Sequence, residues 1–327
     1  MELVKPDIVL LGCPPVVSGG PESVHQLAQI INDLGVRAEI IYSGTTFTVN
    51  GDRLTYEPPT NNPAPEEYAR YSPITARSVS LTDRTLVILP EMYLLMHGLF
   101  APATRFAYWW LSWDNAFARG RRIAGIDPAE RARFFAQSDV LHLAQTFRAH
   151  FLLRREGARQ ILDLLSYTDP RFTTSKPVHP NPTFTVAYSP KRAGMLAKYF
   201  FDRHPDIPGC PIIGMSKDQV RDALGRAMFY MEFGHNPGND RMPREAACVG
   251  CIVLAKAAGG SAYFEDMPLD NSFKFEEQDV TSGKLGTLIK AIVRDPIPAF
   301  VAQSFYRHHL YLDKEQMILQ ARRVLLR

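Results

Sequence analysis

One segment in the second half of the chain constrains the fold more than any other part. Residues 231–254 read MEFGHNPGNDRMPREAACVGCIVL: an apolar strand, a loop of turn-forming residues, a short helix and a second strand. Pro243 suits the first turn of that helix, because proline lacks the N–H that would have no partner there. Asp240, Arg241 and Arg244 lie where the loop meets the helix. Free N–H groups and guanidinium groups at one helix N-terminus favour an anionic ligand.

The beginning of the chain shows the same alternation of strand and helix. Asp7–Leu11 is a compact apolar strand, Pro21–Leu34 has its apolar residues on one helical face, and Val36–Tyr42 is a second strand. This βαβ unit predicts a parallel sheet with a right-handed crossover. Residues 45–71 are polar and rich in proline and asparagine, so we expect a long loop or a hairpin. Further strands are expected at Thr85–Leu89 and Phe106–Trp110, and a short strand followed by a helix within Val140–Glu156.

A stretch with four prolines and no apolar periodicity, Tyr167–Thr183, reads as a linker. The 327 residues of the chain are enough for two domains. We therefore predict two Rossmann-like α/β domains, at 1–174 and 175–300, and a helical segment at 301–327. Beyond the linker the expected elements are the strands Phe184–Tyr188, Pro211–Ile213, Ala227–Met231 and Cys251–Leu254, the helices Gly194–Arg203, Lys217–Leu224 and Thr281–Arg294, and one or two long helices within Ile297–Leu326.

Composition and charge exclude several classes of protein. Hydrophobic residues make up 46% of the chain and charged residues 22%, as in ordinary globular proteins. The formal net charge of +3 is too small to predict a nucleic-acid partner. Cys248 and Cys251 have the spacing of metal ligands, but no second pair completes a site, so we expect buried thiols and no metal. Because no apolar run suits a signal peptide or a membrane span, we expect a cytoplasmic protein.

The segment at 231–254 resembles the donor-sugar site of GT-B glycosyltransferases, especially retaining ones. In those enzymes a pattern like E-x-F-G-x-x-x-x-E-A-x-x-x-G-x-x-V closes the sugar-nucleotide pocket. The resemblance implies that Glu245 holds the ribose hydroxyls of the nucleotide. The loop here is longer, and no glutamate occupies the sugar-binding position near Pro237, where Asp240 is the candidate replacement. The matching residues are Glu232, Phe233, Gly234, Pro243, Glu245, Ala246, Gly250 and Val253.

The resemblance extends over roughly residues 5–280 through the motifs GGPES, PEMY, WWLSWDN and AYSPK. It is to GT-B-like proteins of bacterial surface-polysaccharide biosynthesis. It implies two Rossmann-like domains facing across a cleft, with the acceptor side in residues 1–174 and the donor side in 175–300. It also implies that 301–327 packs back on the first domain.

The donor side is expected to bind phosphate through cations and backbone N–H groups. The resemblance places Lys191 or Arg192 at the donor diphosphate, and Arg241 at the same leaving group, so that these cations stabilise the charge that grows there. Glycines at 19 and 20 let the backbone approach a phosphate or sugar closely, although a plain tight turn explains them equally well. The other candidate donor-binding residues are Asp240, Arg244, Glu245, Ser261 and Ala262, the last two with an ordinary loop as the alternative.

The acceptor side is expected to use polar residues of the first domain. Asp114 is the candidate base if the enzyme inverts, with Glu91 as the second choice. Asn115 and His25 are candidate acceptor ligands, with Glu91. The competing interpretations are an Asx turn for residues 114 and 115 and a solvent-facing helical position for His25. We assign the tryptophans to the core, where alternation along a strand puts Trp109 and Trp110 on opposite faces of the sheet.

The predicted activity is a metal-independent glycosyl transfer that needs no cofactor. The resemblance to retaining enzymes implies that the transfer retains the configuration of the sugar. The donor is a nucleotide-sugar and the acceptor a glycan or a lipid-linked hydroxyl compound. Peripheral membrane association and a homo-oligomer stay open. The alternative is an inactive GT-B-like protein that binds a nucleotide or sugar within an assembly. A two-domain dehydrogenase is disfavoured, because the chain lacks the G-x-G-x-x-G fingerprint.

Overall fold

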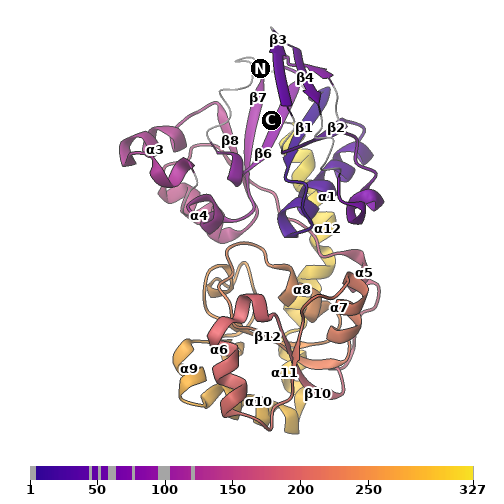
Figure 1. Cartoon of the computed structure of the whole chain (residues 1–327), viewed down its shortest axis with the longest axis vertical. Helices are drawn as coiled ribbons and strands as arrows, with labels where there is room; N and C mark the ends of the chain where they lie inside the picture. The colour runs from indigo at the N-terminus through magenta and orange to yellow at the C-terminus, as the bar shows by residue number, and fades with distance from the viewer. Residues whose placement is uncertain are drawn as a thin grey trace. The chain divides into compact units, whose positions relative to one another are not determined.

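A computed structural model describes residues 5–43, 46–50, 53–57, 64–75, 78–94, 104–118 and 122–326. The chain divides into two compact units (Figure 1). Unit 1 consists of Met1–Tyr167 together with Glu315–Arg327, and unit 2 of Thr168–Lys314. The division falls within the proline-rich stretch at 167–183, which also contains the short helix α5 (Pro170–Thr173).

Unit 1 is built on a parallel sheet in the order β2-β1-β6-β7-β8-β9. Helix α1 (Gly19–Asp33) connects β1 to β2, which confirms the predicted βαβ unit. The predicted hairpin within residues 45–71 is present as β3 (Thr46–Asn50) and β4 (Arg53–Glu57), which pair with β5 (Ser78–Ser80). A 3-10 helix, η1 (Glu66–Tyr71), follows. The strands of the large sheet are β1 (Ile8–Cys13), β2 (Arg37–Tyr42), β6 (Thr85–Pro90), β7 (Arg105–Trp110), β8 (Val140–Ala144) and β9 (Ile161–Asp163).

Both faces of this sheet are covered, so its strands are apolar on both sides. Trp109 packs in the core on one face, with residues of α1 and of the last helix, α12 (Ser304–Leu325). Trp110 packs in the core on the other face, which involves α2 (Trp113–Ala116), α3 (Pro128–Phe135) and α4 (Phe147–Arg155). The predicted placement of the two tryptophans on opposite faces is confirmed.

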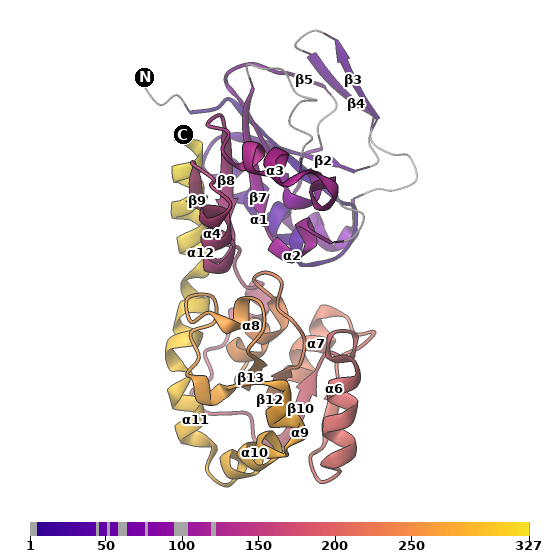
Figure 2. The ribbon, with the colours of Figure 1, turned by 90° about the vertical axis from the view of Figure 1, so that its left-hand side faces the viewer.

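Unit 2 is built on a second parallel sheet, in the order β11-β10-β12-β13-β14. Figure 2 shows α6 on one side of these strands and α11 and α12 on the other. The strands are β10 (Thr183–Tyr188), β11 (Gly209–Pro211), β12 (Ala227–Glu232), β13 (Ile252–Lys256) and β14 (Lys274–Phe275). The helices are α6 (Pro190–Arg203), α7 (Lys217–Leu224), α8 (Arg241–Cys248), α9 (Glu277–Thr281), α10 (Lys284–Arg294) and α11 (Pro296–Ala302).

Two predicted helices have different bounds in the structure, and glycine explains both. The helix expected from Thr281 to Arg294 begins at Lys284 as α10, because Thr281 ends α9 and Gly283 has φ +81° between the two helices. The helix expected from Gly194 begins earlier, at Pro190, and is kinked at Gly194, where φ is +54° and ψ is −145°. A residue without Cβ adopts these angles at little cost.

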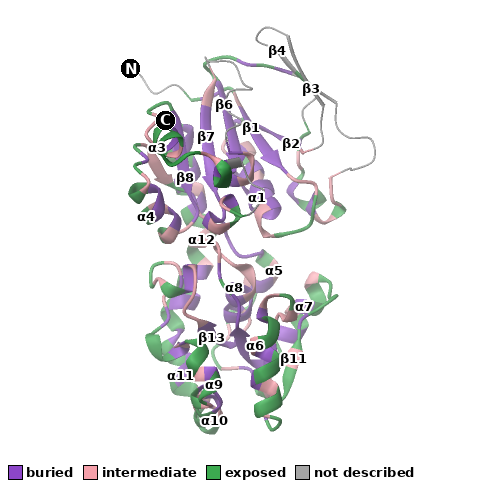
Figure 3. Cartoon of the chain, turned by 60° about the vertical axis from the view of Figure 1, so that its left-hand side comes forward, coloured by how far each residue is buried: buried purple, intermediate pink, exposed green. Residues whose placement is uncertain are grey.

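Burial follows the same plan in both units (Figure 3). The central strands are buried, and the outer faces of the helices are exposed. Cys248 and Cys251 are buried free thiols, as predicted. Within the described ranges, no helix combines the length and apolarity needed to cross a bilayer.

Candidate functional site

The carboxyl edge of the sheet in unit 2 brings together the loops in which the sequence predicts donor-binding residues. Strand β10 lies between β11 and β12, so the connections that leave β10 and β12 run to opposite sides. Such a switch point is where open α/β sheets bind ligands. Arg192 follows β10, and the loop 234–240 follows β12.

Arg192 ties the end of β10 to the loop after β12. Its guanidinium group forms two hydrogen bonds with Asp240, Nη1 to Oδ1 at 2.5 Å and Nη2 to Oδ2 at 3.0 Å. Nη2 also donates to the His235 carbonyl oxygen at 2.7 Å and to Asn236 Oδ1 at 2.9 Å. The predicted donor-binding residues Arg192 and Asp240 are therefore neighbours, and in this structure they bind each other.

A buried carboxylate lies behind this pair. Glu232 is 1% exposed; its Oε2 accepts from the Tyr230 hydroxyl at 3.0 Å and its Oε1 from the Gly234 N–H at 3.0 Å. Burial raises the pKa of Glu232, and the charge of Arg192 opposes this. Burial also raises the pKa of Asp240, and the hydrogen bonds and charge of Arg192 oppose this rise. Burial alone would lower the pKa of Arg192, but its hydrogen bonds and charge interaction with Asp240 outweigh burial, and the pKa lies above its usual value.

The loop after β13 meets the loop after β12 through backbone contacts. Asn236 N–H donates to the Ala258 carbonyl at 3.2 Å, and Gly260 N–H donates to the Asn236 carbonyl at 2.7 Å. Gly259 has φ +68°, and a Cβ there would lie 2.0 Å from the Asn236 carbonyl oxygen. Only glycine allows this approach. The contacts bring the backbone of η5 (Gly260–Ala262), with the predicted residues Ser261 and Ala262, to the carboxyl edge.

The Ser261 side chain is used inside its own loop. Ser261 is 1% exposed, and its hydroxyl donates to the Lys256 carbonyl at 2.5 Å and lies 2.9 Å from the Ala258 carbonyl. A contact between this segment and a nucleotide-sugar would therefore involve the backbone N–H groups, which is the kind of contact that we predict for it.

Helix α8 begins at this edge and carries three predicted donor-binding residues. Glu245 is 2% exposed, and its Oε1 accepts from Lys217 Nζ at 2.6 Å. Arg244 is 2% exposed and donates to Asp313 on α12 at 2.7 Å. Arg241 is the first residue of the helix and partly exposed; burial lowers its pKa, and the charge of Glu245 opposes this. The ribose role of Glu245 stays a prediction, now with Lys217 as its partner.

Lys191 is exposed in the first turn of α6 and forms no ion pair with a described residue. Because its neighbour Arg192 binds Asp240, the neighbour of Arg241, the two segments that carry Lys191 and Arg241 lie together. That their side chains meet on one diphosphate stays a prediction.

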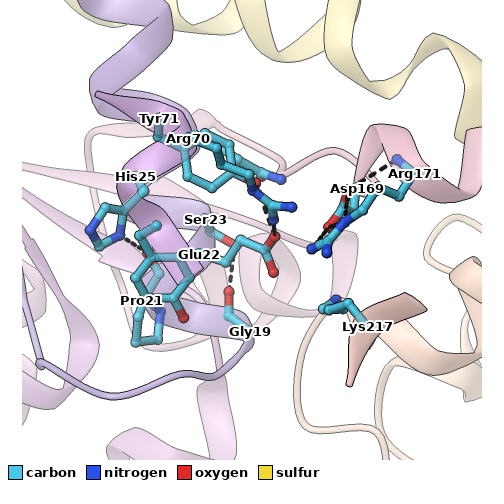
Figure 4. Close-up of polar contacts among 12 residues, drawn as sticks. Gly19, Pro21, Glu22, Ser23, His25, Arg70, Tyr71, Asp169, Arg171 and Lys217 are labelled. Carbon is cyan, nitrogen blue, oxygen red and sulfur yellow. Dashed lines mark hydrogen bonds and ion pairs between the residues drawn. The ribbon is translucent and has the colours of Figure 1, made fainter. Parts of the chain in front are cut away.

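The sequence analysis did not single out several polar residues of unit 2 that form side-chain contacts in the structure. Lys217, Asn236 and the Asp169–Arg171 pair drew no attention, although Ser216 and Gln219 form a capping box that marks the start of α7. In Figure 4, Lys217 is drawn with Asp169 and Arg171, which pair at 2.8 Å between Oδ2 and Nη2. The capping box indicates where α7 begins, but no local pattern in the sequence indicates that Lys217 binds Glu245, 28 residues further along the chain.

Unit 1 has its own switch point, where β1 lies between β2 and β6. Helix α1 starts at Gly19, two residues before the expected start, and both Gly19 and Gly20 are partly exposed. Glu91 follows β6 and is 6% exposed; its Oε2 accepts from the Leu111 N–H at 3.0 Å. The predicted residues of the first unit thus follow the carboxyl ends of β1, β6 and β7, with His25 inside α1.

His25 is not solvent-facing, and this alternative was wrong. It is fully buried, and its Nδ1 lies 2.7 Å from the Pro21 carbonyl (Figure 4). Its Nε2 lies 2.8 Å from the Tyr42 hydroxyl, and the ring stacks on Tyr68 at 4.2 Å. Burial lowers the pKa of His25 to about 4. A direct hydrogen bond from either ring nitrogen to an acceptor would require that nitrogen to lose its present partner, Pro21 or Tyr42.

Asp114 and Asn115 lie in the short helix α2, after β7. Ser112 caps this helix by accepting from the Asn115 N–H at 3.2 Å, so the turn is made by serine and not by an Asx residue. Asp114 forms two hydrogen bonds with Arg148, both at 2.8 Å. Asn115 is exposed.

No family model matches the chain, and no curated protein matches its sequence. Solved structures do match its fold. A structure of TarM from S. aureus in complex with UDP has a TM-score of 0.63 at 8% identity, covering 98% of this chain and 99% of that one. The pneumococcal O-GlcNAc transferase GtfA, in complex with UDP and GlcNAc, has a TM-score of 0.60 at 10% identity, with 98% of each chain covered. The trehalose-6-phosphate synthase OtsA has a TM-score of 0.58 at 8% identity, covering 96% and 98%.

The likeness confirms the predicted fold class: the chain has two parallel α/β sheets and the fold of GT-B glycosyltransferases. At these identities it is the fold that is shared.

Proposed function

We propose that the chain is a glycosyltransferase that moves a sugar from a nucleotide-sugar donor to a hydroxyl group of a glycan or similar acceptor. The observation that carries the proposal is the meeting of the loops after β10, β12 and β13 at the switch point of unit 2, in a chain with this fold. The structures of TarM and GtfA, which share the fold, contain UDP.

In the proposed reaction, Lys191 and Arg241 stabilise the diphosphate as it leaves. The charge on the leaving group grows in the transition state, so cations held at this edge lower the barrier. Lys191 is exposed and Arg241 stands at the first turn of α8, where the helix dipole also favours an anion. In this proposal the cations of the chain take the place of a divalent metal ion.

The proposed stereochemistry is retention. A retaining transfer needs no protein base, because the leaving phosphate can accept the proton of the acceptor hydroxyl. The two candidate bases support this choice, since Asp114 is held by Arg148 and Glu91 accepts from the Leu111 N–H. An inverting enzyme would instead need a carboxylate that is oriented toward the acceptor hydroxyl and accepts its proton.

The proposal is tested by thermal shift with UDP, GDP, CMP and dTDP in the presence of EDTA. A ligand that binds the folded state at about 100 times its Kd should stabilise it by about 2.7 kcal/mol, so one nucleotide should raise Tm. Adenosine, which lacks phosphate, is the matched control and should have no effect. If no nucleotide raises Tm above that of the ligand-free protein, the proposal is contradicted.

A second candidate is a protein of this fold that binds the nucleotide-sugar without transferring the sugar. It is favoured by the loop after β12, because no glutamate lies near Pro237 and Asp240 is bound to Arg192. A hydrolysis assay with the nucleotide-sugar that binds separates the two. Release of sugar or nucleoside diphosphate supports the transferase, and tight binding without turnover in any acceptor mixture supports the second candidate.

A further inference from the structure

Unit 2 contains a cavity of about 350 Å³ that the proposed donor site does not use. It is open to solvent and is lined by α11, α12 and the segment that follows α5. Its lining residues are Lys176, Pro177, Val178, Phe300, Val301, Ser304, Arg307, His308 and Tyr311. The volume lies at the lower end of small-molecule pockets.

The cavity lies at the amino edge of the sheet, opposite the candidate donor site. The Tyr311 hydroxyl donates to the carbonyl of Cys248, the last residue of α8, at 2.9 Å. Pro177 lies against Gly250, just before β13, where a Cβ would be 3.2 Å from its side chain. Helix α8 runs from the carboxyl end of β12 to the amino end of β13, so the donor site and the cavity are at its two ends.

Arg307 is the feature of the cavity that needs an explanation. It is 5% exposed, and its guanidinium carbon lies 3.6 Å from the centre of the Phe300 ring. Nη2 donates to the Phe300 carbonyl, but Nη1 is buried without a hydrogen-bond partner among the described residues. No carboxylate of the described chain pairs with this cation. A buried charge without a counter-charge is costly, and burial lowers the pKa of Arg307 accordingly.

The rest of the lining gives the ligand its shape. Lys176 and His308 add positive or titratable nitrogen, and no acidic residue is among those that line the cavity. Val178 and Val301 are 77% and 58% exposed, which leaves an apolar rim. If Arg307 served only to cap α11, its hydrogen bond to the Phe300 carbonyl would be sufficient. A cap would not explain why Nη1 is buried without a partner, or why the other lining residues include Lys176 and His308.

We infer that this cavity binds a phosphate or carboxylate group carried on a short apolar stem. The anion would lie against Arg307, Lys176 and His308, and the stem against the valines of the rim. The inference goes beyond the proposed function, because it requires neither the nucleotide site nor sugar transfer.

The inference is tested by isothermal titration calorimetry of the full chain with hexyl phosphate, inorganic phosphate and hexanol. Hexyl phosphate should bind at least about tenfold more tightly than either of the others, because only it offers both charge and stem. Arg307→Gln should weaken this binding about tenfold or more, the loss expected for a charge-assisted hydrogen bond. Val301→Trp, which fills the rim without touching the cation, should weaken it as well.

Arg294→Gln is the matched control, since Arg294 is exposed on α10 and does not line the cavity. Absent binding of hexyl phosphate, equal binding of hexanol, or unchanged binding in Val301→Trp overturns the inference even if Arg307→Gln fails to fold. Vesicles of phosphatidylcholine with phosphatidic acid identify the source of the ligand. If the protein sediments with the vesicles and Val301→Trp abolishes this, the ligand is a lipid. If the protein binds hexyl phosphate but does not sediment with the vesicles, the ligand is a soluble compound.

Discussion

At the scale of single residues, Arg192 organises the carboxyl edge of unit 2. One guanidinium group binds Asp240, Asn236 and the His235 carbonyl, so its hydrogen-bonding capacity is largely used within the protein. This makes Arg192 a residue that positions the loop 234–240, and leaves Lys191 and Arg241 as the cations proposed for the diphosphate. The sequence could place Arg192 at this edge but could not show that its partner would be Asp240.

Removing this cation should be costly. Arg192→Gln leaves Asp240 and Glu232 in a buried setting without their positive charge, so we expect a loss of about 2–4 kcal/mol in the free energy of unfolding. Asp240→Asn, measured alone and in the double variant, completes a double-mutant cycle by urea denaturation. Additive effects of the two substitutions would show that the pair is not coupled. Arg221→Gln, at an exposed surface pair on α7, is the control.

Two buried histidines predict acid sensitivity of the fold. Burial lowers the pKa of His25 and of His142 to about 4, from an ordinary value of 6.5. Because both bind protons less well when folded, their stabilising contribution is complete above pH 6.5 and is lost as the pH falls from 6.5 toward 4. At pH 5 each should have lost about 2 kcal/mol.

The measurement is the free energy of unfolding at pH 7 and at pH 5. His142→Gln removes one of the two titrating groups, so its stability should fall less between these pH values than that of the parent chain. An identical pH dependence in the parent chain and in His142→Gln would show that His142 does not titrate as the structure implies.

At the scale of elements, the sequence predicted the strands and helices well where periodicity is strong. Helix α7 has the predicted bounds, Lys217–Leu224, and the tryptophans of β7 alternate between the two cores as expected. The misses depend on side-chain partners far along the chain. His25 is buried because Tyr42 and Tyr68 surround it, and Lys217 joins α7 to α8 by binding Glu245. Neither partnership leaves a pattern in a local window of sequence.

The contact between the loops after β12 and β13 predicts the effect of one methyl group. Gly259→Ala would place a Cβ 2.0 Å from the Asn236 carbonyl at φ +68°, so the loops must separate. We expect a loss of about 2 kcal/mol or more in stability, together with loss of nucleotide binding. Gly214→Ala is the matched control, because Gly214 has φ +65° with nothing within 4 Å of the added methyl group. Equal effects of both substitutions would assign the cost to the backbone angle alone and not to the loop contact.

At the scale of the whole molecule, helix α12 contributes to both units. Tyr306 and Leu310 belong to the core of unit 2, whereas Met317, Ala321 and Val324 belong to a core of unit 1. Residues 315–327 belong to unit 1, although in the sequence they are separated from the rest of that unit by 168–314, which form unit 2. Unit 1 is therefore discontinuous in sequence. The resemblance to GT-B proteins had implied that 301–327 packs back on the first domain, whereas no local motif indicates it.

Met317 tests this discontinuity. It is fully buried in the core of unit 1, so Met317→Ala should lower the stability of that unit by about 2–4 kcal/mol. In differential scanning calorimetry this should appear as a transition that moves to lower temperature. Met195→Ala, at a side chain that is 76% exposed on α6, should leave the trace unchanged. A trace unchanged by Met317→Ala as well would contradict the assignment of this helix segment to unit 1.

The shared helix also sets an order of events during synthesis. A ribosome releases the strands of unit 1 before α12, but the core on one face of their sheet includes Met317, Ala321 and Val324 of that helix. Until α12 has been made, the earlier part of unit 1 leaves exposed the apolar surface against which residues 315–325 pack. A nascent chain stalled before Glu315 should therefore hold a chaperone such as trigger factor, and one stalled after α12 has left the exit tunnel should release it.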